Sequence, residues 1–155
     1  MIGDNGRNYV GADVVTAIRD RLLPRADLAT PNRHELAVLT GGPATIDTDA
    51  TPVAAARRLP LSGPRLALVT GDRHGDEVWT WLIDPERAES CRQPWRDRPI
   101  SGAGDLLAAL FVGYWLRLGA PGVALPAAVT RVSEMIDASG GSRDIDVVAG
   151  LGAQS

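Results

Sequence analysis

The hydrophobic positions of this chain fall into short continuous runs that alternate with stretches of helical spacing. A continuously apolar run over residues 65–70 is typical of a parallel strand that is covered on both faces. A second run, residues 78–83, predicts a strand that returns through residues 90–93 as a hairpin. Residues 27–30 predict a short buried strand that Pro31 ends, and the charged residues 71–76 are expected to form a loop.

Apolar residues at helical spacing mark the segments between these strands. The predicted helices cover residues 12–23, 32–40, 51–59, 105–118 and 125–138. Pro24 is expected to end the first of them. Asn32 and Glu35 have the spacing of a capping box, in which each side chain binds the other residue's backbone amide. Val147 and Val148 are expected in a short closing segment.

Strands that alternate with helices indicate an α/β fold with a mainly parallel sheet. At 155 residues, the sequence predicts a single domain over residues 1–155. Ligands of such sheets bind beyond the carboxyl ends of the strands. Three groups of polar residues fall at such ends, and they comprise Thr30 with Asn32 and Glu35, Thr70 with Gly71, and the turn of residues 102–105.

Composition narrows the classes of function. The formal net charge is −3 and the basic residues are scattered, which argues against nucleic acid as a partner. No apolar run is long enough to cross a membrane, and no signal peptide is recognisable at the start. The one cysteine, Cys91, permits no internal disulfide and fits a reducing cytoplasm. We expect it to be a packing or surface thiol rather than a nucleophile.

All sixteen basic residues are arginine. The absence of lysine excludes a Walker A lysine, a Schiff base and a lysine general base. A phosphate handled by this chain must therefore be bound by backbone amides, arginines or a metal ion.

Residues 100–111 combine a glycine-containing turn, one carboxylate and a long apolar helix. Gly102 and Gly104 leave the backbone bare, and the first amides of the helix have no partner within it, so they form a potential anion site. Asp105 would repel a phosphate, but it could accept a proton from a hydroxyl while the amides hold a phosphoryl group. The alternative is that Asp105 only complements the helix dipole.

Five blocks in order resemble pyridoxal kinases, which belong to the ribokinase-like superfamily. They are residues 3–10, residues 22–41, residues 63–70, residues 101–106 and residues 146–149. The resemblance implies a three-layer α/β sandwich and transfer of phosphate from ATP to a hydroxymethyl group of pyridoxal or a related vitamer. It also implies that the family's N-terminal half, with most of the pyridoxal pocket, is lacking here.

The resemblance assigns roles to individual residues. Asp105 matches the catalytic base, and Ser101, Gly102, Ala103 and Gly104 match the anion hole that binds ATP phosphates. The family often has threonine in place of Ala103. Asn32 and Glu35 match the element that positions Mg²⁺, and Thr30, Glu35 and Thr70 match the ATP site. The alternatives for these residues are a helix cap and ordinary strand-end threonines.

Several expectations follow from the missing half. The chain by itself is expected to bind the vitamin poorly and to turn over slowly or not at all, and the full-length family implies a homodimer. A sugar kinase, a hydroxymethylpyrimidine kinase, a non-catalytic nucleotide-binding remnant and a subunit completed by another chain remain alternatives. The hydroxymethylpyrimidine relatives usually have cysteine where Asp105 stands. A dinucleotide-binding domain is excluded, because the third glycine of its fingerprint would fall at Leu107.

Overall fold

The computed structural model describes residues 1–4, 6–42, 52–59, 63–97, 100–140, 142 and 144–147. The chain divides into two compact units, a first unit of residues 1–92 and a second unit of residues 93–155. Each unit is described by itself. The single domain over residues 1–155 stays a prediction.

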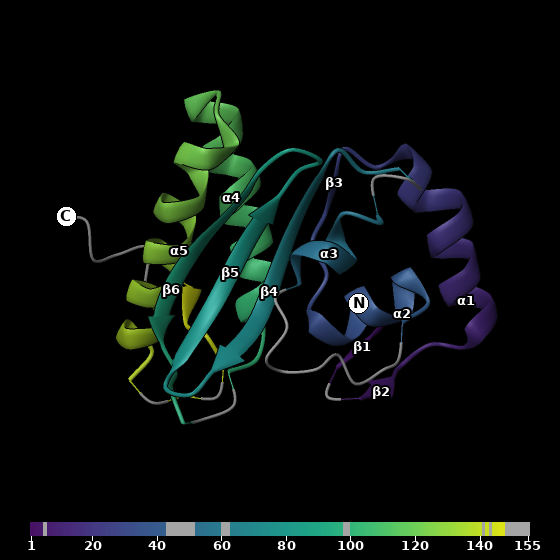
Figure 1. Cartoon of the computed structure of the whole chain (residues 1–155). Coiled ribbons are helices and arrows are strands. Elements are labelled where there is room, and N and C mark those ends of the chain that lie inside the picture. The colour runs from purple at the N-terminus through teal and green to yellow at the C-terminus, as the bar shows by residue number, and fades with distance from the viewer. Residues whose placement is uncertain are drawn as a thin grey trace. The chain divides into compact units, whose positions relative to one another are not determined.

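Strand β4 is the centre of the sheet in the first unit (Figure 1). The strand order of this sheet is β3-β4-β5-β6, with bounds Leu28–Ala29, Leu66–His74, Glu77–Ile83 and Ala88–Pro94. The last two residues of β6, Gln93 and Pro94, belong to the second unit. β3 pairs with β4 in parallel, and β5 pairs with β4 antiparallel. The described sheet is therefore mixed, and the predicted hairpin between the strand of residues 78–83 and residues 90–93 is confirmed.

Alternation along β4 and β5 buries one set of side chains in the core of the first unit. Helix α2 (Arg33–Thr40) and the short helix α3 (Val53–Ala56) contribute to the same core. Its buried members include Leu36, Leu39, Ala56, Leu59, Ala67, Val69, Trp81 and Ile83. Leu66 and Leu68, which alternate with Ala67 and Val69 along β4, are buried too, so both faces of this part of the strand are covered.

The N-terminal part of the first unit is a small hairpin followed by a helical stretch. Strands β1 (Gly3–Asp4) and β2 (Arg7–Asn8) pair antiparallel. Helix α1 (Ala12–Ala17) continues as a π-helical segment, Ile18–Leu22, and a 3-10 turn, Leu23–Arg25. The helical path thus passes Pro24, which lies inside the final turn where its missing amide is tolerated.

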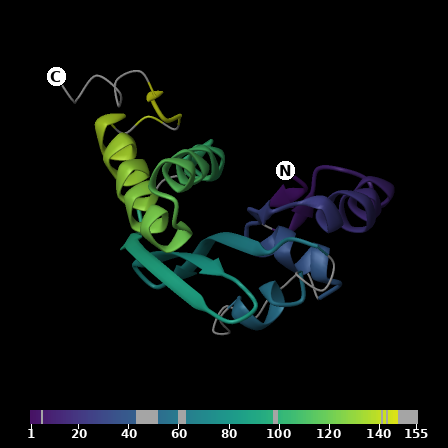
Figure 2. The ribbon, with the colours of Figure 1, turned by 90° about the horizontal axis from the view of Figure 1, so that it is seen from above.

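The second unit contains two helices that lie side by side (Figure 2). Helix α4 spans Ala103–Leu118 and helix α5 spans Pro121–Ala138. Their buried positions include Leu107, Phe111, Leu125, Val129, Val132, Met135 and Ile136. Neither these helices nor any other in the described residues has the length and apolarity needed to cross a membrane.

Pro24 does not end the first helical stretch as predicted, and three further predicted boundaries were wrong. Residues 71–74 belong to β4 rather than to a loop, because alternation buries Asp72 and exposes Arg73. α3 is shorter than the helix predicted over residues 51–59, and Thr51 lies outside the described residues. α5 begins at Pro121, four residues before the predicted start, since proline is well tolerated in a first helical turn. Val148 also lies outside the described residues.

Candidate functional site

The predicted capping box at the start of α2 is confirmed. Oδ1 of Asn32 accepts a hydrogen bond from the backbone amide of Glu35 at 2.8 Å. In return, Oε2 of Glu35 accepts one from the backbone amide of Asn32 at 3.1 Å. The reciprocal bonds satisfy two amides that helix geometry leaves without partners, and Glu35 also complements the helix dipole.

The same two side chains hold the N-terminal hairpin against α2. Oε1 of Glu35 accepts a hydrogen bond from the backbone amide of Ile2 at 2.5 Å. Nδ2 of Asn32 donates to the carbonyl oxygen of Gly3 at 2.9 Å. Nε2 of His34, which lies between Asn32 and Glu35 in the sequence, is 2.7 Å from Oδ1 of Asn8. Asn32 and Glu35 therefore have structural roles in addition to any role toward a ligand.

These contacts limit how Asn32 and Glu35 could hold Mg²⁺. Each carboxylate oxygen of Glu35 already accepts one backbone amide, and Oδ1 of Asn32 accepts another. Each oxygen still has a second lone pair, so the donor set fits a magnesium ion held through water. Among the described residues, no cluster of three or more histidine, cysteine or carboxylate side chains could hold a metal ion directly.

Thr70 lies on β4, and Thr30 lies just beyond the end of the neighbouring strand β3. Thr30 is exposed and directly follows β3. Thr70 is paired with Asn32 in an isolated parallel bridge, and its backbone amide donates to the carbonyl oxygen of Pro31 at 3.1 Å. The bridge keeps the β3–β4 register beyond the end of β3, so β4 brings Thr70 beside the N-cap of α2.

Thr70 is not the last residue of its strand, which corrects the prediction of a strand end there. β4 continues through Gly71, which has φ 71°, to His74, and the pairing with β5 is irregular between Val69 and Asp72. Glycine suits this left-handed backbone because a side chain would be strained. The irregularity places Thr70 at a bend within the sheet rather than at its edge.

Sequence analysis missed Asp72, a fully buried carboxylate next to this bend. Its Oδ1 lies 3.1 Å from Nη1 of Arg33, and its Oδ2 accepts a hydrogen bond from the indole nitrogen of Trp81 at 2.7 Å. Nε2 of His74 lies 3.0 Å from the same Oδ2. In the sequence, only its position at an inward-facing place of an extended strand could have indicated that Asp72 is buried. Its partners Arg33 and Trp81 are not sequence neighbours, so the contacts could not be read from the sequence.

The glycine-containing turn of the second unit leads into α4 as predicted. Gly102 is the N-cap, with φ 79°, and no side chain among the described residues caps the first turn. Its carbonyl oxygen accepts the amide of Leu106 at 2.9 Å. Ser101, just before it, forms an isolated parallel bridge with Asp144. The amides of this turn are thus left without a side-chain acceptor, as an anion site requires.

Asp105 lies in the first turn of α4 and is exposed, as is Gly104, while Ala103 is half-buried. Its carboxylate is therefore accessible for proton transfer, although the same position complements the helix dipole. Thr30, Asn32, Glu35 and Thr70 belong to the first unit, whereas residues 101–105 belong to the second. That the two groups form one site stays a prediction.

Cys91 has no features of an activated nucleophile. It lies half-buried on β6, and this burial, with a smaller contribution from the charge of Glu89, raises the pKa of its thiol. A raised pKa keeps the thiol protonated and unreactive at neutral pH.

Comparisons with known proteins place this chain among small-molecule kinases. The family model described as phosphomethylpyrimidine kinase matches residues 1–147. The pyridoxal kinase of Deinococcus radiodurans is 35% identical, over 98% of this chain and 55% of its own length. The hydroxymethylpyrimidine/phosphomethylpyrimidine kinase of Streptomyces coelicolor is 33% identical, over 87% of this chain and 48% of its own length.

A solved structure agrees with these matches at the level of the fold. Pyridoxal kinase from Entamoeba histolytica has a TM-score of 0.84 and 23% identity, over 98% of this chain and 55% of that chain. The predicted resemblance to pyridoxal kinases and the predicted ribokinase-like α/β class are confirmed. The chain spans about half the length of the relatives it matches.

Proposed function

The chain belongs to the phosphomethylpyrimidine kinase family, and we propose that it supplies the ATP-binding and catalytic-loop part of an enzyme that phosphorylates pyridoxal. The observation that carries this proposal is the turn before α4. There, an exposed carboxylate, Asp105, lies within a helix N-terminus that no described side chain caps. Such a turn offers amides to a phosphoryl group and a base to a hydroxyl in the same few residues.

The proposed reaction is an in-line transfer. The 5′-hydroxymethyl oxygen of pyridoxal forms a bond to the γ-phosphorus of ATP while the bond from that phosphorus to the bridging oxygen of ADP breaks. The hydroxyl proton passes to the carboxylate of Asp105, and the products are pyridoxal 5′-phosphate and ADP. General-base catalysis of this kind typically contributes roughly 10²–10⁴-fold to the rate.

Charge on the transferred group would be stabilised by the amides of Gly102, Ala103 and Gly104. Because the sequence contains no lysine, these amides carry a larger share of that stabilisation than in kinases with a phosphate-binding lysine. Ala103 keeps its amide but lacks the hydroxyl that a threonine would offer. Ser101, Thr30 and Thr70 are proposed as hydroxyl partners of the nucleotide.

Asn32 and Glu35 are the residues proposed to hold Mg²⁺ through water molecules, and Glu35 also borders the nucleotide. When bound, the ion neutralises phosphate charge. Independently of any ion, their side chains hold the N-terminal hairpin against α2, and the bridge of Asn32 holds Thr70 beside the start of α2. This second role requires no metal, so the two can be separated by titrating magnesium.

A hydroxymethylpyrimidine is the second candidate substrate. The description of the matching family and the relative from Streptomyces coelicolor favour it. Pyridoxal is preferred because the pyridoxal kinase of Deinococcus radiodurans matches 98% of this chain, against 87% for the Streptomyces coelicolor relative. The family resemblance also implies cysteine, rather than Asp105, at this position in hydroxymethylpyrimidine kinases. We further propose that the enzyme is a cytoplasmic homodimer that acts on a small molecule, not on nucleic acid or at a membrane.

The proposal is tested by incubating the 155-residue chain with MgATP and each of pyridoxal, hydroxymethylpyrimidine and ribose, followed by mass spectrometry of the products. Phosphorylation of pyridoxal, even at a slow rate, supports the proposal. Faster phosphorylation of hydroxymethylpyrimidine or ribose would show that this other molecule, and not pyridoxal, is the substrate. Nucleotide binding without any product would identify a non-catalytic remnant. Size-exclusion chromatography with light scattering tests the dimer.

A further inference from the structure

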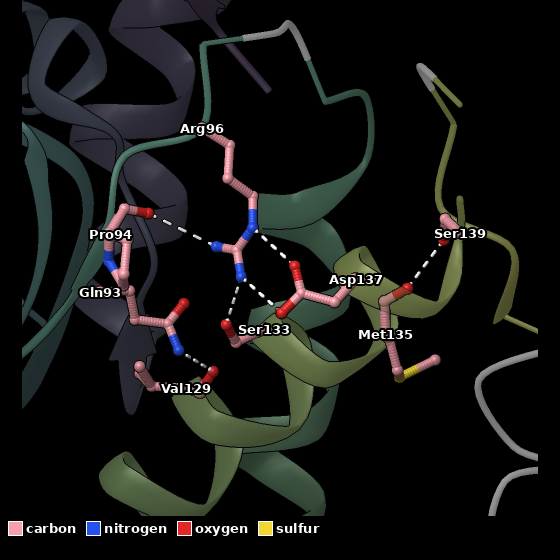
Figure 3. Close-up of polar contacts among 8 residues, drawn as sticks. All are labelled: Gln93, Pro94, Arg96, Val129, Ser133, Met135, Asp137 and Ser139. Carbon is pink, nitrogen blue, oxygen red and sulfur yellow. Dashed lines mark hydrogen bonds and ion pairs between the residues drawn. The ribbon is translucent and has the colours of Figure 1, made fainter. Parts of the chain in front are cut away.

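Arg96 fastens the segment that follows β6 to helix α5 (Figure 3). Its Nε donates to Oδ1 of Asp137 at 2.9 Å, and its Nη2 donates to Oδ2 at 2.8 Å. Nη2 also donates to Oγ of Ser133 at 2.6 Å, and Nη1 donates to the carbonyl oxygen of Pro94 at 3.4 Å. All three nitrogens of the guanidinium thus have partners, and the two-point contact with a carboxylate fixes its orientation.

This contact differs from an ordinary surface ion pair. The side chain of Arg96 is only 18% exposed, although that of Asp137 is 64% exposed. An arginine held by a carboxylate, a hydroxyl and the carbonyl oxygen of Pro94 has given up its rotamer freedom, and the partly covered position reduces screening by water. A contact of this kind restrains the backbone that carries it.

A second contact extends the restraint along the helix. Nε2 of Gln93 donates to the carbonyl oxygen of Val129 at 2.7 Å (Figure 3). Val129, Ser133 and Asp137 recur every four residues, so they lie on one face of α5 over about 12 Å. Four extended residues span a similar length, roughly 10–13 Å. Residues 93–96 therefore form a strap that follows α5.

The C-terminal end of α5 holds the other side of the glycine-containing turn. Oγ of Ser139 donates to the carbonyl oxygen of Met135 at 2.7 Å and accepts the backbone amide of Asp146 at 2.9 Å. Asp144, two residues before, is the bridge partner of Ser101. Ser101 is therefore paired with a segment beyond α5 that is attached to α5, and residues 93–96, which precede Ser101 in the chain, are attached to α5 as well.

These contacts matter because the turn itself has few restraints. Gly102 adopts a left-handed backbone and α4 begins without a side-chain cap among the described residues. An anion hole stabilises a transition state only if its amides are already in place when the charge develops. The anchors on α5 supply that order from outside the turn.

We propose that Arg96 is a positioning residue for the turn of residues 101–105, acting through Asp137 and Ser133 and not through contact with substrate. The catalytic meaning of this inference rests on the proposed function, because that function assigns phosphate binding to the turn. The restraint itself is a property of the second unit and can be measured without any ligand.

Hydrogen exchange of the 155-residue chain tests the restraint directly. Peptides covering residues 100–107 are compared among wild type, Arg96→Ala, Asp137→Ala and the double variant, with peptides of β4 as an internal reference. Glu134→Ala is the matched control, because it removes an ion pair of similar exposure, 56% for Glu134 and 11% for Arg131, that lies within α5 and does not involve residues 93–96. Thermal unfolding first establishes that each variant is folded, and Arg96→Lys replaces Arg96→Ala if that variant is not.

At Leu106, whose amide donates to the carbonyl oxygen of Gly102, each single variant is expected to speed exchange about tenfold, equivalent to about 1.4 kcal/mol. β4 and the Glu134→Ala control are expected to stay unchanged. The double variant should be no faster than either single one, since the two residues make one contact. The proposal is overturned if exchange in a folded Arg96 variant is unchanged, or if it rises equally throughout the second unit. Additive effects in the double variant would also overturn it. If wild type binds no nucleotide, the proposed function fails while the exchange result still decides the restraint.

Discussion

Asp72 and Arg33 join strand β4 to the first residue of helix α2 through a buried ion pair of 3.1 Å. Their side chains are 2% and 15% exposed. The pair lies one residue from Asn32 and two from Thr70, which form the bridge between the same two elements. The first unit therefore holds its candidate ligand residues through a charged contact as well as through sheet pairing.

Replacing Asp72 by alanine is expected to lower the free energy of unfolding by about 3–5 kcal/mol, because it removes the buried carboxylate that the partly buried guanidinium of Arg33 contacts. The indole N–H of Trp81 would lose its acceptor as well. Urea denaturation followed by tryptophan fluorescence measures the change. Asp20→Ala removes an exposed pair with Arg19 and is the control, with an unfolding midpoint expected to match wild type. Equal effects of the two substitutions would show that the buried pair contributes nothing.

Asn32→Ala is expected to lower stability by about 1–2 kcal/mol, because it removes the cap of α2 and the bond to Gly3. Asn32→Asp keeps the cap acceptor but cannot donate to Gly3, so this variant should lose less stability than Asn32→Ala. Chemical denaturation of the three proteins gives the comparison. A fully stable Asn32→Ala protein would indicate that the capping box has no energetic role and that the residue serves only a ligand.

Several elements could be predicted from local sequence because their determinants are local. The capping box needs only Asn32 and Glu35, and the hydrophobic spacing after Asp105 defines α4 within two residues. The extension of β4 through Asp72 could not be predicted, because its buried charge depends on Arg33 and Trp81, which lie far away along the chain. The strap of Arg96 on Asp137 was missed for the same reason.

Cys91 provides a test of the local environment of β6. Burial and the charge of Glu89 raise the pKa of its thiol, so the thiolate fraction at a given pH is smaller in the folded chain than in the unfolded one. As pH rises past the ordinary thiol pKa, the unfolded chain loses its proton first, and stability falls. Alkylation by iodoacetamide at pH 8–9 is expected to be slower in buffer than in urea. Equal rates would contradict a raised pKa.

Glu89→Gln refines that test, because it removes the smaller of the two causes and leaves burial intact. The alkylation rate of the folded variant should rise above that of wild type but remain below the rate in urea. A rate equal to that in urea would mean that the charge of Glu89 alone, and not burial, raises the pKa of the Cys91 thiol.

Asp105→Asn is expected to reduce the formation of pyridoxal 5′-phosphate at least roughly 10²-fold, since the amide cannot accept the hydroxyl proton. The asparagine is nearly isosteric and the residue is exposed, so the unfolding midpoint should not change. Single-turnover assays with MgATP and pyridoxal measure the effect. Retention of the wild-type rate would leave Asp105 as a helix-dipole residue only.

The binding of an ATP analogue tests the central claim most directly, because it requires neither the second substrate nor turnover. Isothermal titration of magnesium with a non-hydrolysable ATP analogue into wild type and Asp105→Asn compares the two affinities. We predict that both proteins bind, and that the variant binds equally well or more tightly, because the substitution removes a negative charge beside the phosphates. Failure of wild type to bind, or loss of binding in the variant, would contradict the account.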